Sequence, residues 1–417
     1  MLAIPLDLPD VQVLQTELTK QHELIITVES TLTSTNCQRC GQPIALLHGH
    51  DDPITLRHLS ILGQAVFIRL RPKRFRCLTC DGRPTTTQRL SWYEPRSLHT
   101  IAYERHLLLV LLNSTVEDVV RKEDVTYDAV LGVLDRWIAS SVEWDTLGAF
   151  EVIGIDEIAL LKGHRDFVVV VTALLITGEV RVLALLPNRL KATLVDWFAR
   201  MPAERRANIK SVCTDLWEAY ITAAQEQLPQ ATIVADRFHV ARLYREGADT
   251  LRKQTIRQLR SSDDATVQED LKATLWPFRK AAHDLQADEQ ARLERLFGHA
   301  PHLKLAYDLR DDLTRIFDTA VSRDDGIAQL AEWEARVAAS GVECFASFLK
   351  TLSKWREIIA NYFIARKTSG FVEGLNNKLK VIKRRCYGLT NLGRFFQRIT
   401  LDLSGEQKFS PWFQPSH

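Results

Sequence analysis

The sequence predicts an α/β protein: a mixed five-stranded sheet with helices on both faces, a large all-helical insertion, and small N-terminal modules. Three observations support this prediction. Apolar, β-rich runs alternate with helical runs between residues 151 and 236, amphipathic helical patterns fill residues 240–365, and two Cys-x-x-Cys pairs stand near the N-terminus. The chain has 417 residues, 46% hydrophobic and 25% charged, which is typical of globular proteins and excludes wholesale disorder.

The N-terminal region contains four paired cysteines, Cys37 with Cys40 and Cys77 with Cys80. Two residues separate the members of each pair, so both thiolates of a pair can reach one tetrahedral ion. We therefore expect a structural Zn²⁺ in a zinc-ribbon DNA-binding domain over residues 1–95, with free or redox-active thiols as the alternative. Within it, "QAVFIRLRPKRFRC" alternates apolar and basic residues like one strand with a solvated face. A closed four-thiolate shell argues against catalysis by this zinc.

Residues 100–145 read as three short helices joined by tight turns. Thr115 and Thr126 stand where N-caps of the second and third helices are expected, and acids follow Thr115 in the first helical turn. This arrangement predicts a helix-turn-helix that contacts DNA. Because the third helix is not very basic, a plain helical connector is the alternative.

From Glu151 the pattern becomes that of a sheet. Three consecutive strands are predicted in "EVIGIDEIAL", "DFVVVVTALLI" and "EVRVLALLP", followed by the helix "KATLVDWFARM". The strand "IKSVCTD", the helix "LWEAYITAAQEQL" and the strand "ATIVAD" come next. This is the ribonuclease H-like order, and we expect that domain to comprise residues 150–239 and 366–405.

The intervening residues 240–365 form six amphipathic runs, of which the second covers residues 265–282. They predict an all-helical insertion into the sheet domain, whose tryptophans Trp276, Trp333 and Trp355 are expected in its core. The insertion could contact DNA, contact a second protomer, or only shape the site.

Two acids interrupt or end apolar strands. Asp156 lies inside "IGIDE" and Asp215 ends "VCTD", and a buried acid is costly unless something compensates its charge. If the first and fourth strands are neighbours, both carboxylates meet at one sheet edge, and Glu373 from a distant helix can complete a site for hard divalent cations. Two Mg²⁺ (or Mn²⁺) ions there would clamp a phosphodiester. The alternative is that these are ordinary strand-end and N-cap acids.

The helix "GFVEGLNNKLKVIKRR" carries the third acid at its head and bases behind it. Val372, Leu375, Leu379 and Ile382 form its expected buried stripe, and Glu373, Asn377, Lys380 and Arg384 form the adjacent one. A second basic run, "RLRPKRFR", begins at Arg69. Such local patches suit double-stranded DNA, although the net charge is only +2 and either patch could be a solvated face. The candidate DNA contacts are Arg69, Arg71, Lys73, Arg74, Arg76, Asn377, Lys380, Lys383, Arg384 and Arg385.

The motifs "GIDE", "CTDLWEAY", "VADRFHV" and "SGFVEGLNNKLKVIKRRCYGLTNLGRF" closely resemble those of the ISL3 family of insertion-sequence transposases. The resemblance covers essentially the whole chain. It implies a DDE transposase that cuts at the ends of its own element and joins the 3′ ends to target DNA, with Asp156, Asp215 and Glu373 as the catalytic acids.

Three further residues near the acids have two interpretations each. Asp236 and His239 resemble the Asp-x-x-His motif of related DDE transposases, which implies that they support the active site or contact DNA beside it; a structural histidine at a strand end is the alternative. Trp217 is expected either to stack on a flipped or frayed base or to belong to the core.

The remaining expectations concern setting and partners. No apolar run approaches the roughly 20 residues that cross a bilayer, and the N-terminus lacks a signal-peptide layout, so we expect a cytoplasmic, nucleoid-associated protein without membrane contact. A homodimer is expected because two element ends must be brought together. The rival functions are a catalytically inactive zinc-ribbon and helix-turn-helix DNA-binding regulator derived from a transposase, and a nuclease that cuts without joining.

Overall fold

The computed structural model describes residues 6, 8–159, 167–261, 264–365, 370–386 and 389–410; of 365 and 370–373 it describes the backbone alone. The chain divides into two compact units, Met1–Ala139 with Gln397–His417, and Ser140–Phe396. Both contain helices and strands, which agrees with the predicted α/β class. Within the described ranges, no helix is long and apolar enough to cross a membrane.

The first unit begins with a four-stranded sheet of order β1-β2-β7-β6. Its core contains Ile26, Val28, Val66 and Ile68, which alternate with more exposed residues along β2 and β7. The strands are β1 (Val11–Leu18), β2 (Leu24–Ser30), β6 (Ile54–Ile61) and β7 (Gln64–Leu70).

A second set of short strands surrounds the cysteines. These are β3 (Thr35–Asn36), β4 (Pro43–Ile44), β5 (Leu46–His50), β8 (Lys73–Arg76) and β9 (Thr85–Thr87), in a β3-β4 pair and a β5-β8-β9 sheet. The prediction of one continuous strand over "QAVFIRLRPKRFRC" was wrong. The segment breaks at Arg71 and Pro72, and its halves join different sheets, because proline cannot donate the hydrogen bond that a continuing ladder needs.

Three helices follow, α1 (Ile101–Leu111), α2 (Val116–Glu123) and α3 (Tyr127–Trp137). The predicted caps are confirmed: the hydroxyl of Thr115 accepts from the N–H of Asp118 in a capping box, and that of Thr126 accepts from the N–H of Ala129. From Gln397 onward, α16 (Leu392–Phe409) belongs to this unit, where Leu401 packs in the core of the three helices.

The second unit contains the predicted five-stranded sheet, in the order β12-β11-β10-β13-β14. The first three strands are antiparallel neighbours, and β13 and β14 run parallel to β10. The sequence placed all five correctly: β10 (Phe150–Ala159), β11 (Phe167–Leu175), β12 (Val180–Leu186), β13 (Ser211–Thr214) and β14 (Thr232–Ala235). Nearly every residue of β11 is buried, as expected for a strand covered on both faces.

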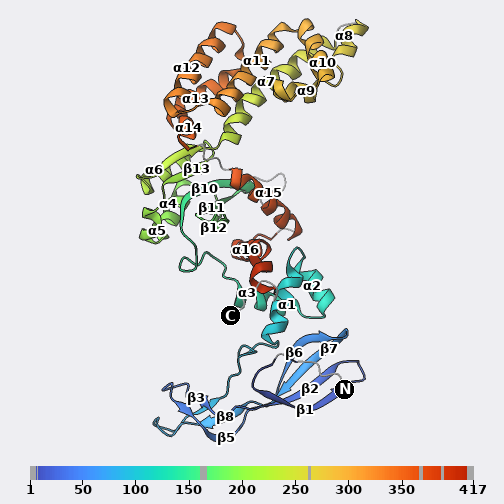
Figure 1. The fold of residues 1–417 in the computed structure, drawn as a ribbon, viewed down its shortest axis with the longest axis vertical. Helices are drawn as coiled ribbons and strands as arrows, with labels where there is room; N and C mark the ends of the chain where they lie inside the picture. Colours follow the sequence, from blue (N-terminus) through green and yellow to red (C-terminus); the bar gives the residue numbers. More distant parts are fainter. Residues whose placement is uncertain are drawn as a thin grey trace. The chain divides into compact units, whose positions relative to one another are not determined.

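Helices lie on both sides of this sheet. Figure 1 shows α4 and α6 beside one face and α15 beside the other, and α6 contacts β13 and β14 whereas α15 contacts β10 and β12. Their bounds are α4 (Lys191–Arg200), α5 (Ala203–Ala207), α6 (Glu218–Gln227) and α15 (Gly370–Arg385). Leu375, Leu379 and Ile382 of the predicted stripe of α15 are buried, and the side chain of its fourth member, Val372, lies outside the described residues.

The segment between β14 and α15 is helical, as predicted (Figure 1). Trp333 is buried and donates from Nε1 to the carbonyl of Leu309 at 2.8 Å, but Trp276 is 68% exposed, so its predicted place in the core was wrong. The run over residues 265–282 is not one helix, because Ala273 adopts a left-handed φ of 53°. The helices are α7 (Arg237–Leu259), α8 (Ala265–Asp270), α9 (Leu275–Arg279), α10 (Ala287–His299), α11 (Pro301–Thr319), α12 (Arg323–Ser340), α13 (Ala346–Ala360) and α14 (Tyr362–Ala365), with 3₁₀ turns η1 (Ala282–Asp284) and η2 (Glu343–Phe345).

Gly247 allows α7 to approach η2 closely, since an added Cβ would lie 2.4 Å from the carbonyl oxygen of Cys344. We expect Gly247→Ala to cost about 1–3 kcal/mol of stability, because backbone must move to relieve the contact. The matched control is Gly298→Ala in α10, where an added Cβ meets nothing within 4 Å. That variant should gain about 0.5–1 kcal/mol from helix propensity. Thermal unfolding followed by circular dichroism checks both, and a melting temperature of Gly247→Ala at or above wild type would contradict the expectation.

Candidate active site

Three neighbouring parallel strands of the second unit share one row of paired residues, at which β13 and β14 end while β10 continues to Ala159. Ile155 of β10 pairs with Thr214 of β13, and Thr214 pairs with Ala235 of β14. The residue after each member of this row is an aspartate: Asp156, Asp215 and Asp236. Parallel strands in register present the residues that follow them at one edge, so the sheet itself brings the aspartates together. The predicted neighbourhood of the first and fourth strands is confirmed.

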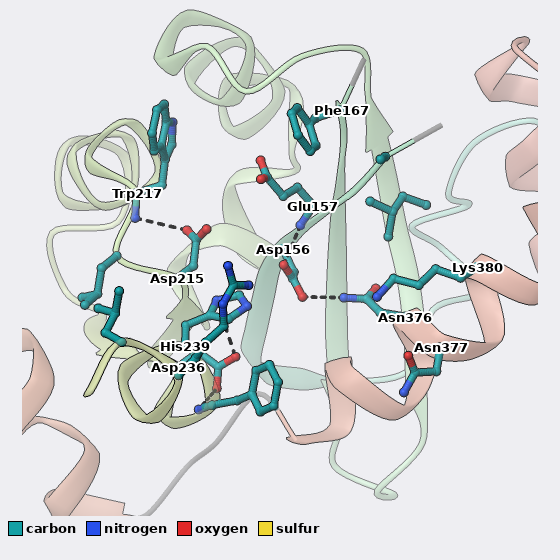
Figure 2. A pocket seen from close by; sticks show the side chains of 16 residues that line it. Asp156, Glu157, Phe167, Asp215, Trp217, Asp236, His239, Asn376, Asn377 and Lys380 are labelled. Carbon is teal, nitrogen blue, oxygen red and sulfur yellow. Dashed lines mark hydrogen bonds and ion pairs between the residues drawn. The ribbon is translucent and has the colours of Figure 1, made fainter. Parts of the chain in front are cut away.

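Asp156 and Asp215 line one open cavity of about 650 Å³. Figure 2 shows both side chains directed toward the same opening, with Trp217 on one side and the residues of α15 on the other. His239, Asn377 and Lys380 also line it. The cavity therefore collects predicted site residues from β10, β13, α7 and α15.

Backbone and side-chain donors fix the two carboxylates. Asp156 accepts from the N–H of Glu157 at 2.7 Å through Oδ1 and from Nδ2 of Asn376 at 2.5 Å through Oδ2. Asp215 accepts from the N–H of Trp217 at 3.1 Å. Among the described residues, neither aspartate forms an ion pair with a lysine or arginine.

Burial dominates the electrostatics of the pair. Burial raises the pKa of Asp156, and it raises the pKa of Asp215 to about 6. The nearby His239 lowers both pKa values, but by less than burial raises them. A desolvated carboxylate favours its neutral form unless a positive charge compensates it. Two such groups without a cationic partner have the oxygen donors that hard divalent cations prefer, so these residues fit Mg²⁺ or Mn²⁺.

Asp236 and His239 stand at the start of α7. Asp236 is buried and caps the helix by accepting from the N–H of Phe238 at 3.0 Å, and Nδ1 of His239 lies 3.9 Å from its carboxylate. Asp236 thus has a structural task at the strand-to-helix junction. His239 also lines the cavity, and both interpretations of it stay predictions.

Trp217 is 43% exposed on the cavity wall, which excludes the core interpretation. The guanidinium of Arg189 lies 4.5 Å from the centre of its ring and 4.6 Å from that of Phe167. Arg189 also approaches Glu157 at 3.4 Å. This stack holds one side of the cavity rigid.

The helix α15 supplies the opposite wall, as Figure 2 shows for Asn376, Asn377 and Lys380. Lys383 donates from Nζ to the carbonyl of Ala159 at 2.7 Å, and Nε of Arg384 donates to the carbonyl of Lys380 at 3.2 Å. Glu373 belongs to α15, but its side chain lies outside the described residues, so its predicted role as third acid stays a prediction.

Sequence reasoning missed Glu157, Arg189 and Asn376. Glu157 stood beside Asp156 in "GIDE", and Asn376 stood beside Asn377 in "GLNNK", so an inspection of neighbours would have found both. Arg189 had no local signal, because its partners are far away in the sequence.

The N-terminal basic run is divided in its roles. Arg69 and Arg71 are exposed, as DNA contacts require, although Nε of Arg71 also donates to the carbonyl of Asp51 at 3.3 Å. The other three are less exposed and have partners inside the first unit: Lys73 donates to the carbonyl of Ser30 at 2.7 Å, Arg74 to the hydroxyl of Thr85 at 2.7 Å, and Arg76 to His48 at 2.9 Å. These three bases connect strands and loops of the unit, a role that the charge pattern alone did not indicate.

The four predicted cysteines converge. Their four sulfur atoms all lie within 4.8 Å of one another. The sulfurs of Cys37 and Cys80 are 4.0 Å apart, and those of Cys40 and Cys77 are 3.8 Å apart. Four thiolates about 2.3 Å from a tetrahedral Zn²⁺ lie about 3.8 Å from one another. All four are free of disulfides, so the donor set and its spacing fit zinc.

The family model and the sequence relatives of this chain agree on one activity. A transposase family model, of the ISL3 type, matches residues 153–399. The transposase for insertion sequence element IS1001 of Bordetella parapertussis is 28% identical over 375 residues, 89% of each chain. The transposase for element IS1557 of Mycobacterium tuberculosis is 23% identical over 398 residues, 90% of this chain and 87% of its own. Among solved structures, the Drosophila P element transposase strand transfer complex aligns with 78% of this chain and 94% of its own, at 9% identity and a TM-score of 0.41.

The raised pKa of Asp215 has a consequence for stability. Because the folded-state pKa, about 6, lies above the usual 3.8, the folded protein binds this proton more tightly than the unfolded chain, and the ionised group costs stability above pH 6. We expect Asp215→Asn to raise the melting temperature at pH 8 without added divalent ions, and to raise it less at pH 5. Added Mg²⁺ should stabilise only the wild type.

Scanning fluorimetry at the two pH values measures this effect. The control is Asp196→Asn, which changes an exposed aspartate of α4 and should shift neither melting temperature. A lower melting temperature for Asp215→Asn at pH 8 would show that the carboxylate stabilises the metal-free protein.

The cysteine cluster makes a separate prediction. We expect Cys40→Ser to lose its zinc on dialysis against a chelator that leaves wild-type zinc bound, since three thiolates hold the ion more weakly than four. Elemental analysis of the dialysed protein measures this. Cys386→Ser, which alters a single cysteine of the second unit, is the control and should keep its zinc. Equal zinc content in Cys40→Ser would remove Cys40 from the ligand set.

Proposed function

Because the chain belongs to the ISL3 family of insertion-sequence transposases, we propose that it is a metal-dependent DDE enzyme acting on the DNA ends of its own element. It binds the terminal inverted repeats, hydrolyses a phosphodiester bond at each end, and joins the 3′ ends to target DNA. The observation that carries this proposal is the row of paired strand residues directly after which Asp156 and Asp215 line one cavity.

The proposed acids are Asp156, Asp215 and Glu373. The sheet order supports a ribonuclease H-like domain, in which the acids of neighbouring strands and a late helix meet. Glu373 precedes Asn376 by three residues in α15, and residues at that spacing share a helix face. Since Asn376 contacts Asp156, this spacing favours Glu373 as the third acid.

The three carboxylates would hold two Mg²⁺ or Mn²⁺ ions, which when bound activate the attacking oxygen and stabilise the leaving one. The residues of the chain provide the geometry for this chemistry. The N–H of Glu157 and the amide of Asn376 orient Asp156, and the N–H of Trp217 orients Asp215. His239, on the cavity wall, supports the pair from the start of α7.

DNA would enter along α15. Lys380 lines the cavity and Arg384 is exposed one turn further, so both can meet phosphates on either side of the scissile bond. Trp217, held by Arg189, offers an exposed ring on which an unpaired base can stack. Lys383 and Arg385 belong to the same basic surface.

The first unit would read the element ends. We assign a structural Zn²⁺ to the four cysteines, DNA-backbone contacts to exposed Arg69 and Arg71, and a helix-turn-helix role to α1–α3. The protein would act on nucleoid DNA as a homodimer, because two ends must be joined in one reaction.

The test uses the flanking DNA of the gene as substrate. We expect Asp215→Ala to abolish Mg²⁺-dependent cleavage while its affinity for the ends changes less than about threefold, because lysines and arginines provide the phosphate contacts. Labelled ends, gel electrophoresis and a binding titration measure both quantities.

Asp196→Ala is the control and should cleave like wild type. Full cleavage by Asp215→Ala would overturn the acid assignment. Binding of the ends by wild type without any cleavage would instead favour the inactive DNA-binding regulator.

A further inference from the structure

Asn376 occupies an unusual place on α15. It is 3% exposed and stands between Leu375 and Leu379, which pack against the sheet domain. Its Nδ2 donates to Oδ2 of Asp156 at 2.5 Å, whereas among the described residues its Oδ1 has no hydrogen-bond partner and is inaccessible. One half of the side chain is therefore paired with an acid of the site, and the other half is buried without a partner.

Packing alone does not explain an asparagine here. A buried acceptor without a partner costs about 1–3 kcal/mol, and a leucine of similar size would avoid that cost beside Leu375 and Leu379. What a leucine could not supply is the donor to Asp156. The contact with the carboxylate is the feature that distinguishes the two side chains.

The contact completes a fixed environment for Asp156. Oδ1 accepts from the N–H of Glu157 and Oδ2 from Asn376, so each oxygen has one fixed donor. A carboxylate oxygen has two lone-pair sites, and each oxygen therefore keeps one for a metal ion. Two donors on different elements also prevent the carboxylate from rotating about its χ2 angle.

We propose that Asn376 is a positioning residue, which holds Asp156 in the orientation that binds the divalent ion. The inference rests on the proposed function, because it takes Asp156 as a metal ligand. It adds a residue that acts through Asp156, and it distinguishes Asn376 from the neighbouring Asn377, which lines the cavity but has no hydrogen bond to either aspartate among the described residues.

The same bond sets the position of α15 on the sheet. Seven residues after Asn376, Lys383 donates to the carbonyl of Ala159, so among the described residues two side-chain hydrogen bonds connect the helix to β10. Of these two, the bond of Asn376 ends on a site carboxylate. Loss of that donor should therefore weaken metal binding as well as helix docking.

The experiment measures Mn²⁺ binding to the zinc-loaded, DNA-free full chain by electron paramagnetic resonance. We expect Asn376→Leu to raise the Kd for Mn²⁺ about 10–100-fold, the usual effect of removing a hydrogen bond to a metal ligand. Cleavage by the variant should recover toward the wild-type rate as Mn²⁺ is raised. Asn376→Ala, which needs no repacking of a larger side chain, should shift the Kd in the same direction.

The matched control is Asn361→Leu. Asn361 also connects a helix to the sheet, donating from Nδ2 to the carbonyl of Ile233 at 2.8 Å, but it bonds to no aspartate of the site. The Asn361→Leu substitution should lower the melting temperature and leave the Kd for Mn²⁺ unchanged. A purely structural Asn376 would behave like Asn361.

The outcomes separate this inference from the proposed function. If Asp156→Asn leaves Mn²⁺ binding intact, the acid site itself is wrong and the inference is wrong with it. If binding depends on Asp156 but neither substitution of Asn376 weakens it, only the positioning role is overturned.

Discussion

The organisation of the second unit depends on one constraint: two half-buried carboxylates must be held on neighbouring strands beside one cavity. Burial raises the pKa of both Asp156 and Asp215, so the desolvation of the ionised carboxylates opposes folding. The strands that carry them compensate through an almost fully buried core, which includes Ile153, Ile155 and Val212. The parallel register of β10 and β13 fixes the positions of the two backbones, so the carboxylates cannot separate without breaking strand hydrogen bonds.

The long helical insertion begins and ends beside the two acids and leaves the strands that carry them adjacent. The chain leaves the sheet at Asp236, one residue past β14, and begins α7 immediately, with the buried carboxylate of Asp236 as its cap. It returns through α15, which contacts β10 at Asp156 and Ala159. Departure and return thus occur at the edge that carries the acids, and the insertion can be long without disturbing the sheet between them.

The sequence predicted the parts of this arrangement that depend on short-range pattern. Strand periodicity located β10, β13 and β14, and the acid after each apolar run followed directly. The choice between Asn376 and Asn377 could not be made from the pattern, because adjacent residues of a helix differ by about 100° and only docking on the sheet fixes the phase. Arg189 escaped notice since its contacts with Trp217 and Glu157 are created by tertiary packing. The division of the basic run was predictable in principle, because Pro72 interrupts it.

The basic end of α15 does not depend on DNA for its own order. Lys383, Arg384 and Arg385 occupy the last turn, where cations stabilise the helix through its dipole, and Lys383 is already bonded to Ala159. In the proposed function, DNA would therefore meet a helix that is formed and attached to the sheet without it, and binding need not be coupled to folding of this segment. Such preorganisation lowers the entropic cost of association and favours a backbone held at a fixed distance from the acids. The bases on this helix and the carboxylates on the sheet then act as one rigid surface, with Asn376 as a polar link between them.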